Sequence, residues 1–325
     1  MPKNVTVRLY DPVDAPRWNE FVRHARNATF LFDRGFMEYH ADRFADYSLV
    51  ISSGDKWLAV LPAHRTGNVV LSHWGLTYGG LVYGNEVRQS DVIMILKGVL
   101  EFLADGRIDA LRIKLLPRIY PDKPSDELAY ALFLADARLI RRDSLSVIDQ
   151  TTDAKISRGR MEGIKRGQNH GLSVVGETDF SAFWNKILIP NLQQKHNASP
   201  VHSLEEIELL HSRFPSNIKQ FNVYKGDEIV AGTTLFVTEN VVHSQYISAD
   251  ERKNELGSVD FLYHHLLGYY RDKRYFDFGI SNESDGRKLN DGLIFWKESF
   301  GATTVVQDFY EVETKNSVLL DDVLL

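Results

Sequence analysis

The chain repeats itself at a fixed spacing. Residues 54–72 align without a gap on residues 226–244, an offset of 172, and eight of the nineteen aligned positions are identical. Gly54 and Gly226 open the two copies, and Ser72 and Ser244 close them. Average residue usage gives roughly one identity over such a stretch. An unbroken register of this kind predicts a duplicated structural unit.

Each copy has the pattern of an antiparallel β-meander followed by helix, strand, helix and strand. Turn residues at Gly54 and Gly226 separate apolar segments of strand type, and the helical segments carry apolar faces at helical spacing. The pattern predicts an α+β fold of two tandem domains, each a mixed, mostly antiparallel sheet flanked by helices. After the meanders, the expected elements are 91–103, 110–115, 126–135 and 145–148 in copy one, and 258–270, 275–278, 290–300 and 304–310 in copy two.

The division between the two copies is expected at a short polar stretch, residues 150–153. A chain of 325 residues is long enough for two domains of ordinary size. We therefore expect an N-terminal domain at 1–150 and a C-terminal domain at 151–325. A basic segment, 155–170, joins them.

Composition excludes several classes of protein. No apolar run approaches the roughly 20 residues of a membrane span, and the first residues lack the apolar core of a signal peptide. The chain has no cysteine, which excludes disulfides and thiolate chemistry and fits a cytoplasmic location. A net charge of -6 disfavours a large nucleic-acid footprint. No histidines show the usual spacing of a metal site, so we expect no metal.

The loop 249–260 is the first candidate site, because a polar, Gly-containing loop feeding a helix can hold a phosphate. Gly257 would let the backbone approach the ligand, and Ser258 is a plausible N-cap. Asn254, Arg252 and Lys253 stand nearby. The alternative is an ordinary strand-to-helix turn with a capping serine.

The basic segment is the second candidate, because it concentrates positive charge in an acidic chain. Arg160, Lys165 and Arg166 are suited to a second phosphorylated ligand. The alternative is a solvated linker helix.

Histidines and carboxylates supply candidates for a general base. Lys195, His196 and His202 surround a loop between two expected helices, where a histidine can act as a base or simply cap a helix. His265 falls on an apolar helical face and is expected in the core.

A polar loop follows the strand 275–278 and contains Asn282, Glu283 and Asp285, in the kind of position where sites collect. In the next helix Lys297 shares a face with Asn290 and apolar residues. A lysine on such a face is unusual, and its ordinary explanation is that it reaches out to solvent.

These segments together resemble the GNAT acyltransferases. The family's phosphate loop, [Gln/Arg]-x-x-Gly-x-[Gly/Ala], corresponds here to 254–259, with Gly257 matching and Asn254 departing from the pattern. Its last helix, Asn-x-x-Ala-x-x-x-Tyr-x-x-x-Gly, corresponds to 290–301, with Asn290 and Gly301 matching and Lys297 in the tyrosine position.

Two fused units with that lysine look like the FemABX peptidyltransferases, which transfer amino acids from aminoacyl-tRNA to cell-wall precursors. The basic segment 160–171 and the stretch around Tyr78 are similar to features of that group. The chain also resembles tandem-GNAT sugar N-acyltransferases of surface-polysaccharide pathways, one of which acts on dTDP-3-amino-3,6-dideoxy-galactose. The acidic net charge favours this second branch.

The resemblance implies transfer of an acetyl or 3-hydroxybutyryl type of acyl group from acyl-CoA to the amino group of a nucleotide-linked amino sugar, by direct attack on the thioester. It implies that the second domain binds CoA and is catalytic, while the first is a non-catalytic wall on the acceptor side. Lys297 would stabilise the oxyanion or the thiolate. The base would come from His196, His202, Glu283 or Asp285.

The resemblance also implies two sets of binding residues. CoA would be bound by Gly257, Ser258, Asn254, Arg252, Lys253, Tyr246 and Asn290. The acceptor would be bound by Arg160, Lys165, Arg166, Tyr78, Lys195 and Asn282. Two alternatives remain open: an aminoacyl-tRNA-dependent peptidyltransferase, and a degenerate GNAT pair acting as a binding module.

Overall fold

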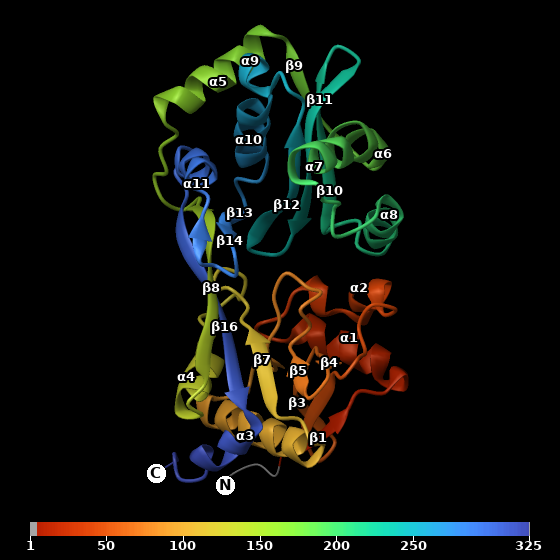
Figure 1. Ribbon diagram of the computed structural model, residues 1–325, viewed down its shortest axis with the longest axis vertical. Coiled ribbons are helices and arrows are strands. Elements are labelled where there is room, and N and C mark those ends of the chain that lie inside the picture. Colours follow the sequence, from red (N-terminus) through yellow and green to blue (C-terminus); the bar gives the residue numbers. More distant parts are fainter. Residues whose placement is uncertain (1–4, 325) are drawn as a thin grey trace. The chain divides into compact units, whose positions relative to one another are not determined.

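The computed structural model describes residues 5–324 (Figure 1). Contacts divide the chain into two compact units. Unit 1 holds the described residues up to Asp143, together with Ser284–Arg287 and the described residues from Val306 onward. Unit 2 holds Ser144–Glu283 and Lys288–Val305. Unlike the limits expected at 150/151, these units are not contiguous in sequence, because the chain returns to unit 1 near its C-terminus.

Unit 1 contains two groups of strands and four α-helices. One sheet has the order β1-β2-β3-β6, and a second group has β5 between β4 and β7, with β16 next to β7. The helix α3 buries the apolar face expected from its sequence, including Ile95, Leu96 and Val99. The elements are β1 (Thr6–Leu9), α1 (Ala15–His24), α2 (Arg34–Met37), β2 (Leu49–Ser53), β3 (Lys56–Leu61), β4 (His64–Thr66), β5 (Val69–Leu71), β6 (Val82–Tyr83), α3 (Gln89–Asp105), β7 (Ala110–Lys114), α4 (Glu127–Leu134), β8 (Arg138–Asp149) and β16 (Thr303–Glu313), of which β8 and β16 contribute residues to both units.

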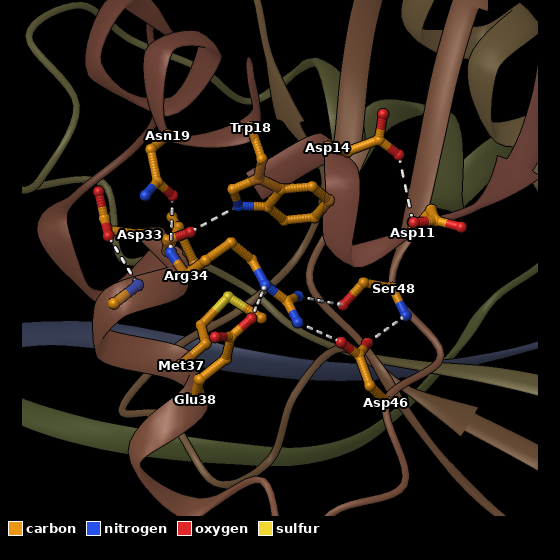
Figure 2. Close-up of polar contacts among 12 residues, drawn as sticks. Asp11, Asp14, Trp18, Asn19, Asp33, Arg34, Met37, Glu38, Asp46 and Ser48 are labelled. Carbon is orange, nitrogen blue, oxygen red and sulfur yellow. Dashed lines mark hydrogen bonds and ion pairs between the residues drawn. The ribbon is translucent and has the colours of Figure 1, made fainter. Parts of the chain in front are cut away.

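A buried arginine ties the N-terminal elements of unit 1 together (Figure 2). Arg34 is 5% exposed and lies over the ring of Tyr10, 3.8 Å from its centroid. Its guanidinium pairs with Asp46 and with Glu38, and it donates to Ser48 Oγ at 3.3 Å. Two carboxylates and a hydroxyl thus accept its hydrogen bonds, so that the buried guanidinium is not left unpaired.

Unit 2 has one mixed sheet with helices on both faces. Its strand order is β8-β13-β12-β11-β10-β9, in which β12 and β13 are parallel and the other neighbours are antiparallel. The elements are α5 (Arg158–Asn169), β9 (Leu172–Glu177), α6 (Ser181–Phe183), the π-helix η4 (Trp184–Leu188), α7 (Ile189–His196), α8 (Leu204–Arg213), β10 (Ile218–Lys225), β11 (Glu228–Val237), β12 (Val241–Ala249), α9 (Lys253–Leu256), α10 (Ser258–Tyr269), β13 (Tyr275–Ile280), β14 (Asn282–Glu283), β15 (Lys288–Leu289) and α11 (Asp291–Glu298).

The strand registers confirm the sequence repeat. The pairing of β2 with β3 is interrupted just after Ile51↔Ala59, and the pairing of β10 with β11 just after Val223↔Ala231, at the same offset of 172. The parallel pairs are also equivalent: β5 pairs with β7 over Val69–Leu71, and β12 with β13 over Val241–His243. The predicted α+β class with two tandem units is therefore confirmed.

Two local expectations were wrong. The apolar spacing of residues 35–44 also predicts a helix there, but the structure has only the short α2 followed by a 3-10 turn. His265 is exposed rather than in the core, because the buried face of α10 is formed by Leu262, Tyr263 and Leu266. Among residues 5–324, no helix is both long and apolar enough to cross a membrane.

Candidate active site

The strands β12 and β13 form a fork in unit 2. They pair in parallel over three residues only, the last pair being His243 with Asp277. Beyond that pair β12 continues to Ala249 with β11 as its partner, while β13 continues beside β8. One edge of β12 therefore presents backbone groups without a strand partner in the described chain, available to a ligand. A β-bulge at Gln245 bends β12 just beyond the point where it separates from β13, which is the apex of the fork.

A cavity of about 580 Å³ opens beside the free edge of β12. That volume is within the usual range for a small-molecule site. Its walls come from α5, α7, β12, α9, α10 and α11, all in unit 2. The lining residues are Arg160, Arg166, Asn191, Leu192, Ile247, Ser248, Ala249, Lys253, Asn254, Val259, Asp260, Gly292, Leu293 and Trp296.

The charge of the cavity favours an anionic ligand. Arg160, Arg166 and Lys253 line it against one carboxylate, Asp260. Arg160 Nη1 donates to Asp260 Oδ1 at 2.8 Å, and Trp296 Nε1 donates to the same oxygen at 3.1 Å. The Nε–H of Arg160 is buried without a partner among the described residues. A buried donor of this kind destabilises the fold unless a ligand accepts its hydrogen bond.

Two glycines bring α5 and α10 into direct contact. A Cβ on Gly257 would lie 2.0 Å from the carbonyl oxygen of Gly163, and a Cβ on Gly163 would lie 1.9 Å from Asp260 Oδ2. Gly257 also has a φ of +66°, which side chains rarely adopt. Its N–H donates to Lys253 O at 2.9 Å. The glycine is therefore required for helix packing, and its own amide is not directed at a ligand.

The expected N-cap at Ser258 was wrong. The N-cap of α10 is Gly257, and Ser258 is the first helical residue, with its Oγ buried and without a partner among the described residues. The first turn of a helix leaves N–H groups without intrahelical acceptors. Val259 and Asp260 stand in that turn and line the cavity, together with Lys253 and Asn254 from α9. This donor set, with the cations above, fits a phosphate-bearing ligand.

Other residues expected near CoA lie elsewhere. Arg252 pairs with Asp250 and Glu228 and does not line the cavity. Asn290 is the N-cap of α11, where its Oδ1 accepts the N–H of Leu293 at 3.0 Å.

His202 and Tyr246 are packed against each other. His202 Nδ1 lies 2.6 Å from Tyr246 Oη, and the Tyr246 ring packs edge-on against Trp184. Burial raises the pKa of Tyr246 to about 12. Neither residue lines the cavity.

The remaining expected residues are spread over the chain. Asn282 and Glu283 form β14, and exposed Asp285 pairs with Arg141 in unit 1. Lys165 is exposed on α5, outside the cavity. Tyr78 is buried in unit 1 and donates to Thr29 Oγ1 at 2.9 Å. The side chains of two candidates lie outside the described part of the structure: Lys195 and His196.

Lys297 is buried instead of reaching solvent. It is 4% exposed, and its Nζ donates to the carbonyl oxygens of Gly279 at 2.9 Å and Ile280 at 2.8 Å. Desolvation lowers the pKa of Lys297 to about 8, against the opposing effect of Asp277. The ammonium thus holds the end of β13, and its side chain does not line the cavity.

The lowered pKa of Lys297 predicts a pH-dependent gain in stability. The folded pKa of about 8 lies below the ordinary value of 10.5, so between these values the unfolded chain binds more protons than the folded one. Stability therefore rises with pH across this window. We expect urea unfolding from about pH 8 to about pH 10 to show a larger rise for the wild type than for Lys297→Met. Equal rises would contradict the lowered pKa.

Sequence reasoning missed one pair at the fork. His243 Nδ1 lies 2.8 Å from Asp277 Oδ2, and Asp277 Oδ1 accepts the N–H of Gly279 at 2.7 Å. The two residues are 34 positions apart and are brought together by the parallel register of β12 and β13. The sequence repeat was the only signal that could have suggested this register. In copy one, the equivalent parallel pair is Leu71 with Arg112.

The equivalent place in unit 1 is filled by its own chain. The N–H of Gly79 donates to Lys114 O at 2.8 Å, and Lys114 Nζ donates to Leu76 O at 2.6 Å. A Cβ on Gly79 would lie 1.9 Å from Ser72 O, so the loop after β5 packs directly on the strand end. The nearby cavity has a volume of only about 40 Å³.

Comparison with known proteins identifies a domain within the chain. Residues 160–288 match the sequence family described as an acetyltransferase (GNAT) domain. They run from α5 to β15 and contain most residues of the cavity. No curated protein matches the chain at a significant level. Among the described residues, no group of three or more His, Asp or Glu side chains is arranged to hold a metal.

Solved structures support the fold. The chain is similar to FemX, with a TM-score of 0.65 and 10% identity, over 93% of this chain and 96% of that one. It is similar to the C-terminal domain of a candidate lysylphosphatidylglycerol synthetase from Agrobacterium fabrum, with a TM-score of 0.58 and 16% identity over 95% of each chain. It is also similar to L-PGS from Bacillus licheniformis, with a TM-score of 0.57 and 13% identity over 96% of each chain. Residues 160–288 thus match a GNAT acetyltransferase domain, and such a domain implies an acyl-CoA cosubstrate.

Proposed function

We propose that unit 2 binds acyl-CoA in the cavity beside β12 and transfers the acyl group to an amine. The observation that carries this proposal is the fork, where a free strand edge, a cavity of about 580 Å³ and three cations occur together. The amide-bearing pantetheine arm would pair with the free edge of β12. The phosphates would bind Lys253, Arg166 and the first turn of α10.

The chemistry proposed is direct attack of a neutral amine on the thioester. Positioning of the two substrates and stabilisation of the developing charge would supply most of the acceleration. Two of the three N–H donors of Lys297 are used by backbone carbonyls. We assign the third to the oxyanion or the leaving thiolate.

A nucleotide-linked amino sugar, with dTDP as the nucleotide, is the proposed acceptor, and surface-polysaccharide synthesis the proposed setting. Its support is the sequence resemblance given above. Unit 1 is proposed to be non-catalytic, and the loop that fills its fork supports this role. A cytoplasmic location, in keeping with the absence of cysteine, completes the proposal.

An aminoacyl-tRNA donor is the second candidate function. It is favoured by the likeness to FemX and by the basic residues of α5, of which Arg158, Lys165 and Arg166 are exposed. Incubation of the protein with labelled acyl-CoA or with charged tRNA, each with a dTDP-amino sugar, separates the two functions. Label on the sugar from acyl-CoA supports the first proposal, whereas label only from tRNA overturns it. Failure to bind any acyl-CoA in calorimetry would instead favour a binding module.

Removal of the two cavity cations is expected to weaken binding of the donor. Lys253→Ala combined with Arg166→Ala should raise KM for acyl-CoA about 100-fold, since each of the two charge-assisted hydrogen bonds contributes about 1.5 kcal/mol. Because these groups contact the non-reacting end of the donor, kcat should change little. Steady-state kinetics measure both constants. The matched control is Arg158→Ala, on the same helix but outside the cavity and paired with Glu162; an equal rise in the control would refute the assignment.

A further inference from the structure

The pair formed by His243 and Asp277 has the geometry of an oriented base. A carboxylate can only accept hydrogen bonds, so the 2.8 Å contact requires that His243 Nδ1 carries the proton and donates it to Asp277 Oδ2. The neutral ring then has its lone pair on Nε2, which faces away from the carboxylate. Asp277 is fully buried and is also held by the N–H of Gly279. Its position, and through it the histidine tautomer, is thus fixed.

The pair stands at the apex of the fork. His243 and Asp277 are the last residues joined before β12 and β13 separate. Ala249, at the other end of the free edge, lines the cavity next to the phosphate-binding residues. Six residues of strand span about 20 Å, which is on the scale of an extended phosphopantetheine arm. A donor whose phosphates lie by α10 would therefore bring its thioester toward the apex.

His243 is buried but keeps a small exposed surface. The residue is 8% exposed, whereas Asp277 is 0% exposed. Its cross-strand neighbour on β11 is the apolar Phe236. From α11, Lys297 interacts electrostatically with Asp277.

We propose that His243 is the general base of the reaction and that Asp277 is its positioning residue. This inference rests on the proposed function, because it requires an amine acceptor. Of the bases expected from sequence, His202 packs against Tyr246 and Asp285 pairs with Arg141, while the side chain of His196 lies outside the described residues.

The proton balance is complete without a further reactant. His243 Nε2 takes one proton from the acceptor ammonium and releases it to solvent. The neutral amine attacks the thioester carbon, so that a C–N bond forms and the C–S bond breaks. The second proton of the nitrogen passes to the departing thiolate. The products are one amide, one CoA thiol and one released proton.

The test uses three single variants of the full chain. His243→Gln removes the base, and Asp277→Asn offers an N–H to Nδ1 and so moves the ring proton to Nε2. Each should lower kcat about 100-fold, the usual contribution of a general base, and should remove the rise of kcat with pH. The control is His264→Gln, an exposed histidine on α10, which should keep wild-type kcat. A kcat within threefold of wild type in His243→Gln would overturn the inference.

Two further measurements separate this inference from the proposed function. Calorimetry should give the same affinity of His243→Gln and wild type for acyl-CoA; loss of donor binding in the variant would make His243 a structural residue and overturn its role as a base. Nitrogen NMR of the histidine rings should show Nδ1 protonated in the wild type and Nε2 protonated in Asp277→Asn, and an unprotonated Nδ1 in the wild type would overturn the inference whatever the donor is. If the wild type itself neither binds nor uses acyl-CoA, the proposed function fails instead.

Discussion

Replacement of Lys297 by methionine is expected to lower turnover more than tenfold while acyl-CoA still binds. A tenfold loss corresponds to about 1.4 kcal/mol of transition-state stabilisation, which is modest for a cation removed from a buried site. The ammonium is 4% exposed and interacts with Asp277, so its charge acts through little water. Methionine keeps most of the volume of the side chain and removes only the charge and the donors.

A second buried lysine supplies the matched control. Lys114 in unit 1 also donates to a backbone carbonyl, that of Leu76 at 2.6 Å, and desolvation lowers its pKa to about 8. Lys114→Met should therefore perturb stability in the same way as Lys297→Met but leave kcat at saturating substrates near wild type. Steady-state kinetics and calorimetry on both variants check this. Equal loss of kcat in the two variants would mean that Lys297 acts through the fold alone, and wild-type kcat in Lys297→Met would remove it from the mechanism.

The architecture could be predicted from the sequence because it depends on periodic patterns. The repeat at Gly54 and Gly226 led to the two equivalent meanders, since side-chain alternation and turn residues are local properties. The π-helix η4 between α6 and α7 and the return of the chain to unit 1 could not be predicted from such local patterns. They depend on tertiary contacts, which no window of residues reports.

The site was only partly predictable for a related reason. Lys253, Asn254, Arg160 and Arg166 were expected near a ligand and do line the cavity, because they stand on elements that the loop and the basic segment identify. The pairing of Arg252 with Asp250 and Glu228 could not be foreseen, because the charge of a residue does not show which way its side chain points.

His243 was missed because its partner comes from another strand. Only the parallel register of β12 and β13 places Asp277 next to it, and a register is a property of the folded sheet. Its single-sequence context gives no spacing that distinguishes it from a core histidine. Ser258 illustrates the opposite error: its residue type favours an N-cap, but α9 precedes it and Gly257 takes that place.

Substitution of Gly257 by alanine is expected to have the largest effect on stability. Two costs add at this position. The left-handed backbone, with a φ of +66°, costs a side chain about 1–2 kcal/mol. The new Cβ would also lie 2.0 Å from Gly163 O, a backbone atom that can move only if α5 moves, and overpacking of this kind costs about 1–3 kcal/mol.

Comparison with Gly226 isolates the second cost, that of packing. It has nearly the same backbone, with a φ of +59°, but nothing lies within 4 Å of its missing Cβ. Gly226→Ala should therefore show the conformational cost alone, and Gly257→Ala should melt about 4–8 °C lower than it, given about 2 kcal/mol of extra destabilisation. Because α5 carries Arg160 and Arg166 into the cavity, its displacement should also weaken acyl-CoA binding in Gly257→Ala and not in Gly226→Ala. Thermal melts and calorimetry on the two variants measure both effects. Similar melting temperatures would show that α5 can move aside freely, and the close packing of α5 on α10 would then not be what shapes the donor site.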